Sequence, residues 1–177
     1  MKHHTLPVAA LVVVVATALA HAQVKKMDMP GVSNFSRVDA TIGCGGATQP
    51  AAMAGLKKAG FNSVINLRTA TEKGADIDAG RTAAESAGLK YIHLPFDSAN
   101  PDPTLVETFL AAVSDTANQP VYIHCGSANR VAAVWMIKRV LRDGWSMGRA
   151  LEEAEAIGLT SAPLKTFAVE YIERHKQ

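Results

Sequence analysis

Residues 120–142 constrain the fold most, because a strand, a short loop and a long helix follow one another there without a break. The segment VYIH, from Val121 to His124, has the apolar and β-branched character of a buried strand. Small residues come next, and Arg130 begins a mostly apolar helical stretch that ends near Arg142. A strand that leads directly into a helix is the unit of sheets that carry helices on their faces.

The rest of the chain repeats this alternation of short apolar strands and longer helical segments. The expected strands cover residues 38–42, 63–67 and 91–94, and the expected helices cover residues 48–59, 78–87, 103–117, 146–157 and 163–175. The glycine-rich segment GCGG, residues 43–46, is expected to end the first strand. We therefore predict one α/β domain over residues 35–177, with a mostly parallel central sheet flanked by helices.

The N-terminus has the features of a secretory signal peptide. Lys2 gives a positive start, residues 6–20 are almost wholly apolar, and Ala20-His21-Ala22 places small residues where a signal peptidase cuts. An uncleaved membrane anchor is the alternative, but the apolar run is shorter than the ~20 residues of a spanning helix. We predict a signal peptide over residues 1–22, cleaved after Ala22, and a periplasmic or secreted protein without membrane attachment. Residues 23–34 are polar and are expected to form a lead-in to the domain.

Composition argues against several classes of function. The formal net charge is only +2 and no basic block is present, which is not typical of a protein that binds nucleic acid through phosphate contacts. Two cysteines are too few for a disulfide-rich scaffold, and no Cys/His spacing suits a zinc site. We expect no nucleic-acid partner, no metal and no organic cofactor.

The loop between Cys125 and Arg130 is typical of an anion site. Backbone N–H groups of a tight loop converge there at the start of a helix, whose dipole also favours negative charge. Arg130 adds a planar fork that suits a tetrahedral oxyanion. A cysteine in such a nest is expected to have a strongly depressed pKa and to act as a nucleophilic thiolate. The alternative is a buried structural cysteine beside an arginine at a helix start.

These considerations define the candidate site. Cys125 and Arg130 are the candidate catalytic residues. The candidate oxyanion-binding loop consists of Gly126, Ser127, Ala128, Asn129 and Arg130.

Three separated segments resemble a known family. They are GATQP (Gly46 to Pro50), GFNSVINLR (Gly60 to Arg68) followed by Glu72, and HCGSANR (His124 to Arg130). The last is similar to the signature loop of cysteine-dependent tyrosine and dual-specificity phosphatases. Together, over about residues 35–157, the segments resemble the small bacterial beta-lactamase-hydrolase-like phosphatase family.

This resemblance implies a dual-specificity-phosphatase-like fold and a phosphorylated substrate or another small oxyanion. It also implies hydrolysis of phosphate monoesters, in which Cys125 forms a phosphocysteine and Arg130 holds the phosphoryl oxygens. An aspartate from another loop would then protonate the leaving oxygen.

Three departures from the usual phosphatase pattern leave other functions open. Four residues separate Cys125 from Arg130, whereas the usual loop has five, and a loop of four is similar in length to that of rhodanese-type sulfurtransferases. Ala128 stands where the family often has glycine, and a left-handed backbone costs alanine about 1 kcal/mol. Val131 stands where phosphatases commonly place a hydroxyl. The alternatives are therefore sulfur transfer through a Cys125 persulfide and a weakly catalytic or non-catalytic oxyanion-binding module.

Two aspartates precede the signature loop and could supply the general acid. Asp97 directly follows a strand end in Leu-Pro-Phe-Asp and is our candidate acid. Asp102 comes before Pro103 and is expected to cap a helix instead.

Three further residues are candidates for supporting roles. His124 is expected to orient the loop by hydrogen bonds rather than to transfer protons. Arg68 leaves the carboxyl end of a strand, where it either supports the pocket or only pairs with Glu72. Cys44 is either inert or a redox partner of Cys125, and a disulfide requires their Cα atoms to lie within about 7 Å.

Overall fold

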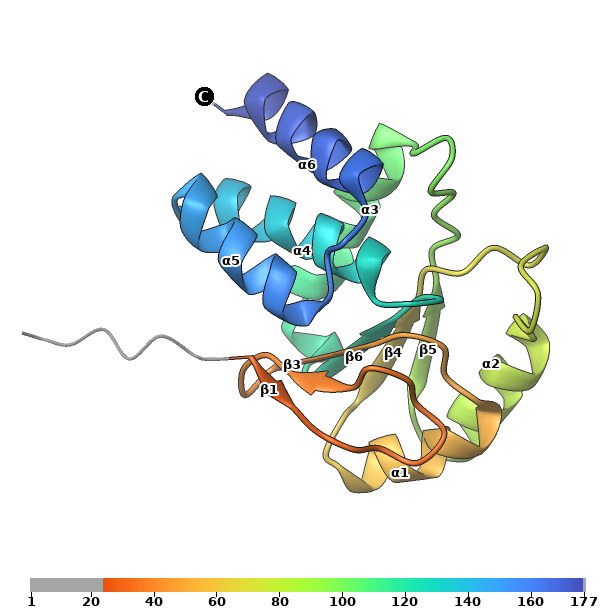
Figure 1. Cartoon of the computed structure of the whole chain (residues 1–177). Helices are drawn as coiled ribbons and strands as arrows, with labels where there is room; N and C mark the ends of the chain where they lie inside the picture. Colours follow the sequence, from red (N-terminus) through yellow and green to blue (C-terminus); the bar gives the residue numbers. More distant parts are fainter. Residues whose placement is uncertain (1–23, 177) are drawn as a thin grey trace, which may run out of the picture.

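The structure is a computed structural model that describes residues 24–176, so the signal peptide predicted for residues 1–22 lies outside the described residues (Figure 1). Its centre is a six-stranded sheet in the order β1-β2-β3-β6-β4-β5. The strands are β1 (Lys25–Lys26), β2 (Ser36–Arg37), β3 (Ile42–Gly45), β4 (Ser63–Asn66), β5 (Lys90–His93) and β6 (Val121–His124). Strands β3, β6, β4 and β5 are parallel, and β1 and β2 add an antiparallel edge, which confirms the predicted mostly parallel sheet.

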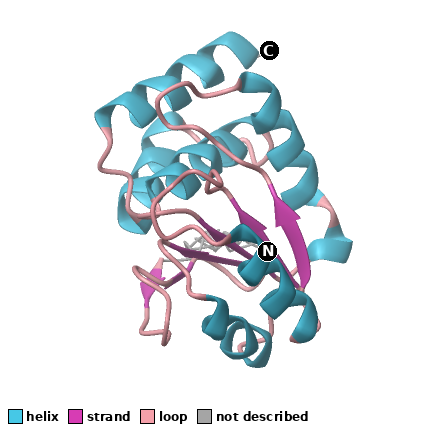
Figure 2. Cartoon of the chain, turned by 90° about the vertical axis from the view of Figure 1, so that its right-hand side faces the viewer, coloured by secondary structure: helices cyan, strands magenta, loops and turns pink. Residues whose placement is uncertain are grey.

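Helices cover both faces of this sheet (Figures 1 and 2). The helices are α1 (Met53–Lys58), α2 (Ile77–Ser86), α3 (Pro103–Ser114), α4 (Asn129–Leu141), α5 (Met147–Ile157) and α6 (Ala162–His175), with short 3-10 turns η1 (Pro50–Ala52) and η2 (Thr116–Asn118). Helices α1 and α2 lie on one face, and α3 to α6 gather on the other. Helix α4 is buried along most of its length between the sheet and its neighbours α5 and α6.

The sheet separates two hydrophobic clusters. The larger cluster joins α3, α4, α5 and α6 to the sheet, and Trp135 is its largest fully buried side chain. The smaller cluster lies under α1 and α2 and includes the rings of Phe35, Phe61 and Tyr122, which contact one another. Because both faces of β6 are covered, every residue of VYIH is buried, as the apolar run predicts.

The first parallel strand differs from its prediction. It was expected over residues 38–42 with a break at 43–46, but β3 covers Ile42–Gly45 and so includes Gly43 and Gly45. Asp39 forms a turn before the strand by accepting hydrogen bonds from the backbone N–H groups of Thr41 and Ile42. A Cβ atom on Gly43 would collide with the Phe61 ring, and one on Gly45 would collide with the Tyr122 hydroxyl. The glycines therefore let aromatic rings lie against the strand; they do not end it.

The N-terminal segment also needs correction. Residues 23–34 were expected to be a lead-in, yet β1 pairs with β2 and extends the sheet. Backbone pairing at an edge requires no apolar periodicity, so a polar sequence gave no sign of it. This segment packs beside the loop described next.

Candidate active site

The loop after β6 leaves a row of backbone donors without partners. Among the described residues, the N–H groups of residues 126–130 donate to no acceptor. Helices α2, α3, α5 and α6 each have an aspartate or serine side chain that caps the first turn, but α4 has no side-chain cap. Unpaired N–H groups at a helix start attract an anion, so this loop has the donor pattern of an oxyanion site.

Ala128 adopts the left-handed backbone that its place in the loop led us to expect. Its φ is 76° and its ψ is −8°, and its side chain is fully buried. A non-glycine residue in this region is strained, and packing must hold it there. One neighbour is Gly158, where a Cβ atom would lie 3.5 Å from the Cβ of Ala128.

The other loop residues connect the loop to its surroundings. The carbonyl of Gly126 accepts a hydrogen bond from the N–H of Ala47, which ties the loop to the end of β3. The Asn129 side chain bridges the loop to the start of α6: its Nδ2 donates to the Ser127 hydroxyl at 3.2 Å, and its Oδ1 accepts hydrogen bonds from the N–H groups of Thr160 and Ser161, both at 2.7 Å. Residues from distant parts of the chain therefore fix the loop's shape.

Arg130 is held along one edge of its guanidinium group. Nη1 donates to Glu72 Oε1 at 2.5 Å and to the carbonyls of Phe96 and Leu67, while Nη2 donates to Glu72 Oε2 at 2.7 Å. Within residues 24–176, Nε–H donates to no oxygen or nitrogen, Nη2 donates only to Glu72, and the Cys125 thiol lies within hydrogen-bonding reach of the guanidinium. The edge formed by Nε and Nη2 remains available for a pair of oxyanion oxygens.

Glu72 is the functional residue that the sequence analysis did not assign. Burial alone would raise its pKa, but hydrogen bonds from Arg130 and from the Thr69 N–H lower the pKa to about 2, so the carboxylate stays charged. Arg68 also donates to Glu72 and holds the same loop through the carbonyls of Lys73 and Gly74. Arg68 therefore pairs with the same carboxylate that binds Arg130, and its supporting role in the pocket stays a prediction.

Cys125 lies at the base of the loop and is almost completely buried. Its N–H donates to the carbonyl of Gly45 at 3.3 Å. Burial tends to lower the pKa of Arg130, but the hydrogen bond to Glu72 and the charge of nearby Cys125 raise it. The sulfur and the guanidinium therefore face each other, as the predicted catalytic pair requires.

His124 is buried on the opposite side of β6, where its ring stacks on Tyr122 with 5.7 Å between the centroids. Burial and the charges of Arg68 and Arg130 lower its pKa to about 3, so the ring is neutral at ordinary pH. Neither ring nitrogen makes a hydrogen bond with the described residues. A neutral, buried ring is consistent with a positioning role, and that role stays a prediction.

The two aspartates have the places that the sequence suggested. Asp102 caps α3 and accepts a hydrogen bond from the N–H of Thr104 at 2.8 Å. Asp97 is exposed, and its Oδ1 accepts a hydrogen bond from the N–H of Ala99. It directly follows Phe96, whose carbonyl binds Arg130, so the backbone carries Asp97 to the edge of the site.

Of the two alternatives for Cys44, the structure shows no disulfide with Cys125, because both cysteines are free thiols. In the sheet, Cys44 lies opposite Ile123, two residues before Cys125. Such a diagonal in neighbouring strands spans roughly 8 Å between Cα atoms, which exceeds the reach of a disulfide. Burial raises the pKa of the Cys44 thiol well above its usual value, which favours the protonated thiol over the reactive thiolate.

Comparison with known proteins identifies the family. Residues 34–142 match the family described as "Beta-lactamase hydrolase-like protein, phosphatase-like domain". The chain belongs to this phosphatase-like family. The resemblance inferred from the three sequence segments is thereby confirmed, as is the phosphatase-like character of the domain. None of the curated proteins matches the chain.

Solved structures of phosphatases have the same fold. A DUF442 protein of Shewanella putrefaciens CN-32 is 23% identical with a TM-score of 0.69, and covers 83% of this chain and 94% of its own. TpbA of P. aeruginosa is 21% identical with a TM-score of 0.68, over 89% of this chain and 92% of its own. The core catalytic domain of the PP-IP phosphatase SIW14 of S. cerevisiae has the same identity, 21%, and TM-score, 0.68, over 83% and 93%. These likenesses confirm the dual-specificity-phosphatase-like fold of the family member described here.

Among residues 24–176, no helix combines the length and the apolar character that crossing a bilayer requires.

Proposed function

We propose that this protein hydrolyses phosphate monoesters through a phosphocysteine on Cys125. The observation that carries the proposal is the set of donors around that sulfur. The unpaired N–H groups of residues 126–130 and the Nε edge of Arg130 are available to a tetrahedral oxyanion, while Glu72 holds the rest of the guanidinium. Donors that are fixed before the reaction stabilise the charge that develops on the phosphoryl oxygens.

The reaction proceeds in two displacements. The Cys125 thiolate attacks phosphorus, the bond to the leaving oxygen breaks, and Asp97 gives its proton to that oxygen. Water then attacks the phosphocysteine, Asp97 takes a proton from the water, and phosphate leaves as the thiolate is restored. The position of Asp97 next to Phe96, a direct partner of Arg130, supports this assignment.

The substrate class follows from the chemistry of the loop. Amide donors and a guanidinium edge recognise a dianionic or monoanionic oxyanion, so we infer a phosphorylated substrate. Among the structural relatives, a cysteine-to-serine variant of TpbA was solved in complex with pTyr, and SIW14 was solved with citrate. Those ligands belong to those proteins; they support an oxyanion for this chain and leave its leaving group open.

Sulfur transfer through a Cys125 persulfide is the second candidate, favoured by the four-residue loop alone. An aryl phosphate assay and a thiosulfate–cyanide assay on the same purified protein separate the two. We expect turnover of the aryl phosphate that exceeds turnover of thiosulfate. The reverse result would replace phosphate hydrolysis with sulfur transfer.

Variants of the site complete this test. Cys125→Ser should abolish turnover but still bind inorganic phosphate, since the loop amides and Arg130 remain. Arg130→Lys should lower kcat/KM by about 10²–10³-fold, because an ammonium lacks the planar edge. Full activity of Cys125→Ser would locate the reaction elsewhere.

A further inference from the structure

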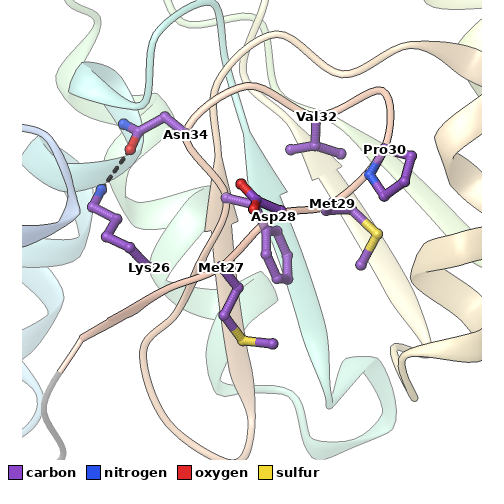
Figure 3. Close-up of a pocket in the computed structure, with 8 residues that line it drawn as sticks. Lys26, Met27, Asp28, Met29, Pro30, Val32 and Asn34 are labelled. Atoms are coloured by element: carbon purple, nitrogen blue, oxygen red, sulfur yellow. Dashed lines mark hydrogen bonds between the residues drawn. The ribbon is translucent and has the colours of Figure 1, made fainter.

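Two residues of the N-terminal segment reach the outer side of the oxyanion loop. Nδ2 of Asn34 donates to the carbonyl of Ser127 at 3.4 Å and to that of Ile157 at 3.2 Å. The ammonium of Lys26 donates to Asn34 Oδ1 at 2.5 Å and to the Ile157 carbonyl at 2.8 Å. Figure 3 shows these two side chains turned toward each other, to one side of the pocket that residues 26–35 line.

The Ser127 carbonyl matters because of the peptide to which it belongs. In a planar trans peptide the C=O and the following N–H point in opposite directions. Asn34 holds the Ser127 carbonyl toward the outside of the loop. The N–H of Ala128 is therefore turned the other way, toward the interior where the anion would bind.

The Ser127–Ala128 peptide requires a contact that keeps it in its observed orientation. Ala128 has a φ of 76°, a conformation in which an alanine is strained by about 1–2 kcal/mol. Rotation of the Ser127–Ala128 peptide would relieve that strain and turn the N–H away from the anion. A hydrogen bond to the outward carbonyl opposes this rotation.

The surrounding backbone is shaped to admit Asn34. Asn34 itself has a φ of 52°, a region that asparagine tolerates better than most residues. Gly158 has a φ of 140°, and a Cβ atom there would lie 2.8 Å from Asn34 Nδ2. The Ile157 carbonyl ends α5, where a helix leaves its acceptors unpaired and a cation such as Lys26 is favourable.

We propose that Asn34, oriented by Lys26, is a positioning residue that fixes the Ser127–Ala128 peptide with its N–H toward the bound oxyanion. The inference rests on the proposed oxyanion-binding function of the loop. Asn34 is the first residue of the family match, and Lys26 lies outside it. The positioning pair is therefore formed in part by a segment that the family match does not include.

Asn34→Gly is the decisive variant, because glycine keeps the left-handed backbone and removes only the side chain. The control is Asn62→Ala. This change removes another hydrogen bond from a side chain to a carbonyl, that of Gln119, at the opposite end of the sheet.

The experiment measures three quantities: the affinity for inorganic phosphate, kcat and KM for an aryl phosphate, and hydrogen exchange of residues 126–130. Asn34→Gly should weaken phosphate binding and lower kcat/KM by about 10-fold or more, up to the ~10²–10³-fold of a lost oxyanion donor, and should speed exchange in the loop. Asn62→Ala should leave all three unchanged, whatever it does to the melting temperature.

Three further variants separate positioning from general support. Asn34→Asp keeps an acceptor for Lys26 but places an oxygen against the Ser127 and Ile157 carbonyls, so it should be at least as impaired as Asn34→Gly. Lys26→Met keeps the apolar stem and should give a smaller loss, which Lys26→Arg should largely restore.

The outcomes distinguish this inference from the proposed function. Phosphate affinity and loop exchange of Asn34→Gly equal to those of the wild type would overturn the positioning role, even if the variant were less stable. A wild type that binds phosphate without hydrolysing the ester would contradict only the proposed reaction, because the phosphate and exchange measurements still decide the role of Asn34. A wild type that does not bind phosphate contradicts the proposed function, and positioning then fails as well.

Discussion

Glu72 fixes the orientation of the guanidinium group of Arg130, which otherwise ends a long and flexible side chain. Its two oxygens bind both terminal nitrogens of the guanidinium, so rotation of the fork about its own axis is prevented. The carboxylate is in turn held by Arg68 and by the N–H of Thr69. The orientation of the Arg130 guanidinium therefore depends on Glu72.

The low pKa of Glu72 gives a prediction about acid stability. A carboxyl with its pKa lowered from 4.5 to about 2 stabilises the fold above pH 4.5, and this contribution is lost as the pH falls through about 2. Glu72→Gln should therefore have a lower urea midpoint than the wild type at pH 7, and the difference should shrink between pH 4.5 and pH 2.

The control is Glu155→Gln, because Glu155 makes an exposed ion pair with Lys165. Its urea midpoint should stay close to that of the wild type at every pH. A Glu72→Gln difference that is equal at pH 7 and pH 2.5 would show that charge is not what Glu72 contributes.

Asp97 gives a second prediction at the level of single residues. Asp97→Asn should slow hydrolysis of an aryl phosphate by about 10²–10⁴-fold and flatten the high-pH limb of the rate profile, because the proton donor is lost. Asp102→Asn should change activity little, since asparagine caps a helix nearly as well as aspartate. Equal losses in the two variants would mean that Asp97 is not the acid.

At the level of elements, β3 depends on glycines that the sequence analysis interpreted as a break. The Phe61 ring lies against Gly43, and the guanidinium of Arg37 covers the ring at 4.2 Å from its centroid. A side chain on Gly43 would have to displace that ring within the smaller core. The strand and the aromatic cluster are therefore one packing unit.

Gly43→Ala should destabilise the protein by about 1–3 kcal/mol, the usual cost of overpacking a core. The matched control is Gly148→Ala in α5, where a Cβ atom meets nothing within 4 Å. Helix propensity predicts that this second change is neutral or stabilising by about 0.5–1 kcal/mol. Chemical unfolding of the two variants measures the contrast, and equal effects would refute the role assigned to the Phe61 contact.

The sequence predicts elements well where the signal is local. Asp102 before Pro103 marks the start of α3, and the run VYIH matches β6 residue for residue. Prediction from the sequence fails where two contacting residues lie far apart along the chain. Glu72 and Arg130 are 58 residues apart, and no local pattern shows that they meet.

The same limit explains the other errors. Pairing of β1 with β2 depends on backbone groups that every residue has, so the polar sequence around Lys25 was uninformative. The glycine-rich sequence of β3 resembles that of a turn, and only the aromatic rings packed against the glycines explain their presence. The proximity of Cys125 and Arg130, the proposed catalytic pair, could be inferred from the sequence because the two residues flank one short loop.

For the whole molecule, we propose export, with removal of residues 1–22. The proposal rests on the apolar N-terminal run and the small residues before Gln23. The mass of the protein recovered from its native host's envelope fraction should correspond to a chain that begins at Gln23. A mass that includes Met1, found together with the cytoplasmic proteins, would contradict export.

The missing side-chain cap of α4 has a practical consequence for studying this protein. On the proposed function, its unpaired loop amides accept any tetrahedral oxyanion in the solution in place of a side-chain cap. A ligand that binds only the folded state raises the melting temperature with its concentration. Phosphate and sulfate buffers would therefore thermally protect the enzyme and inhibit it at the same time, and a melting screen of phosphorylated metabolites in an amine buffer becomes a direct search for its substrate.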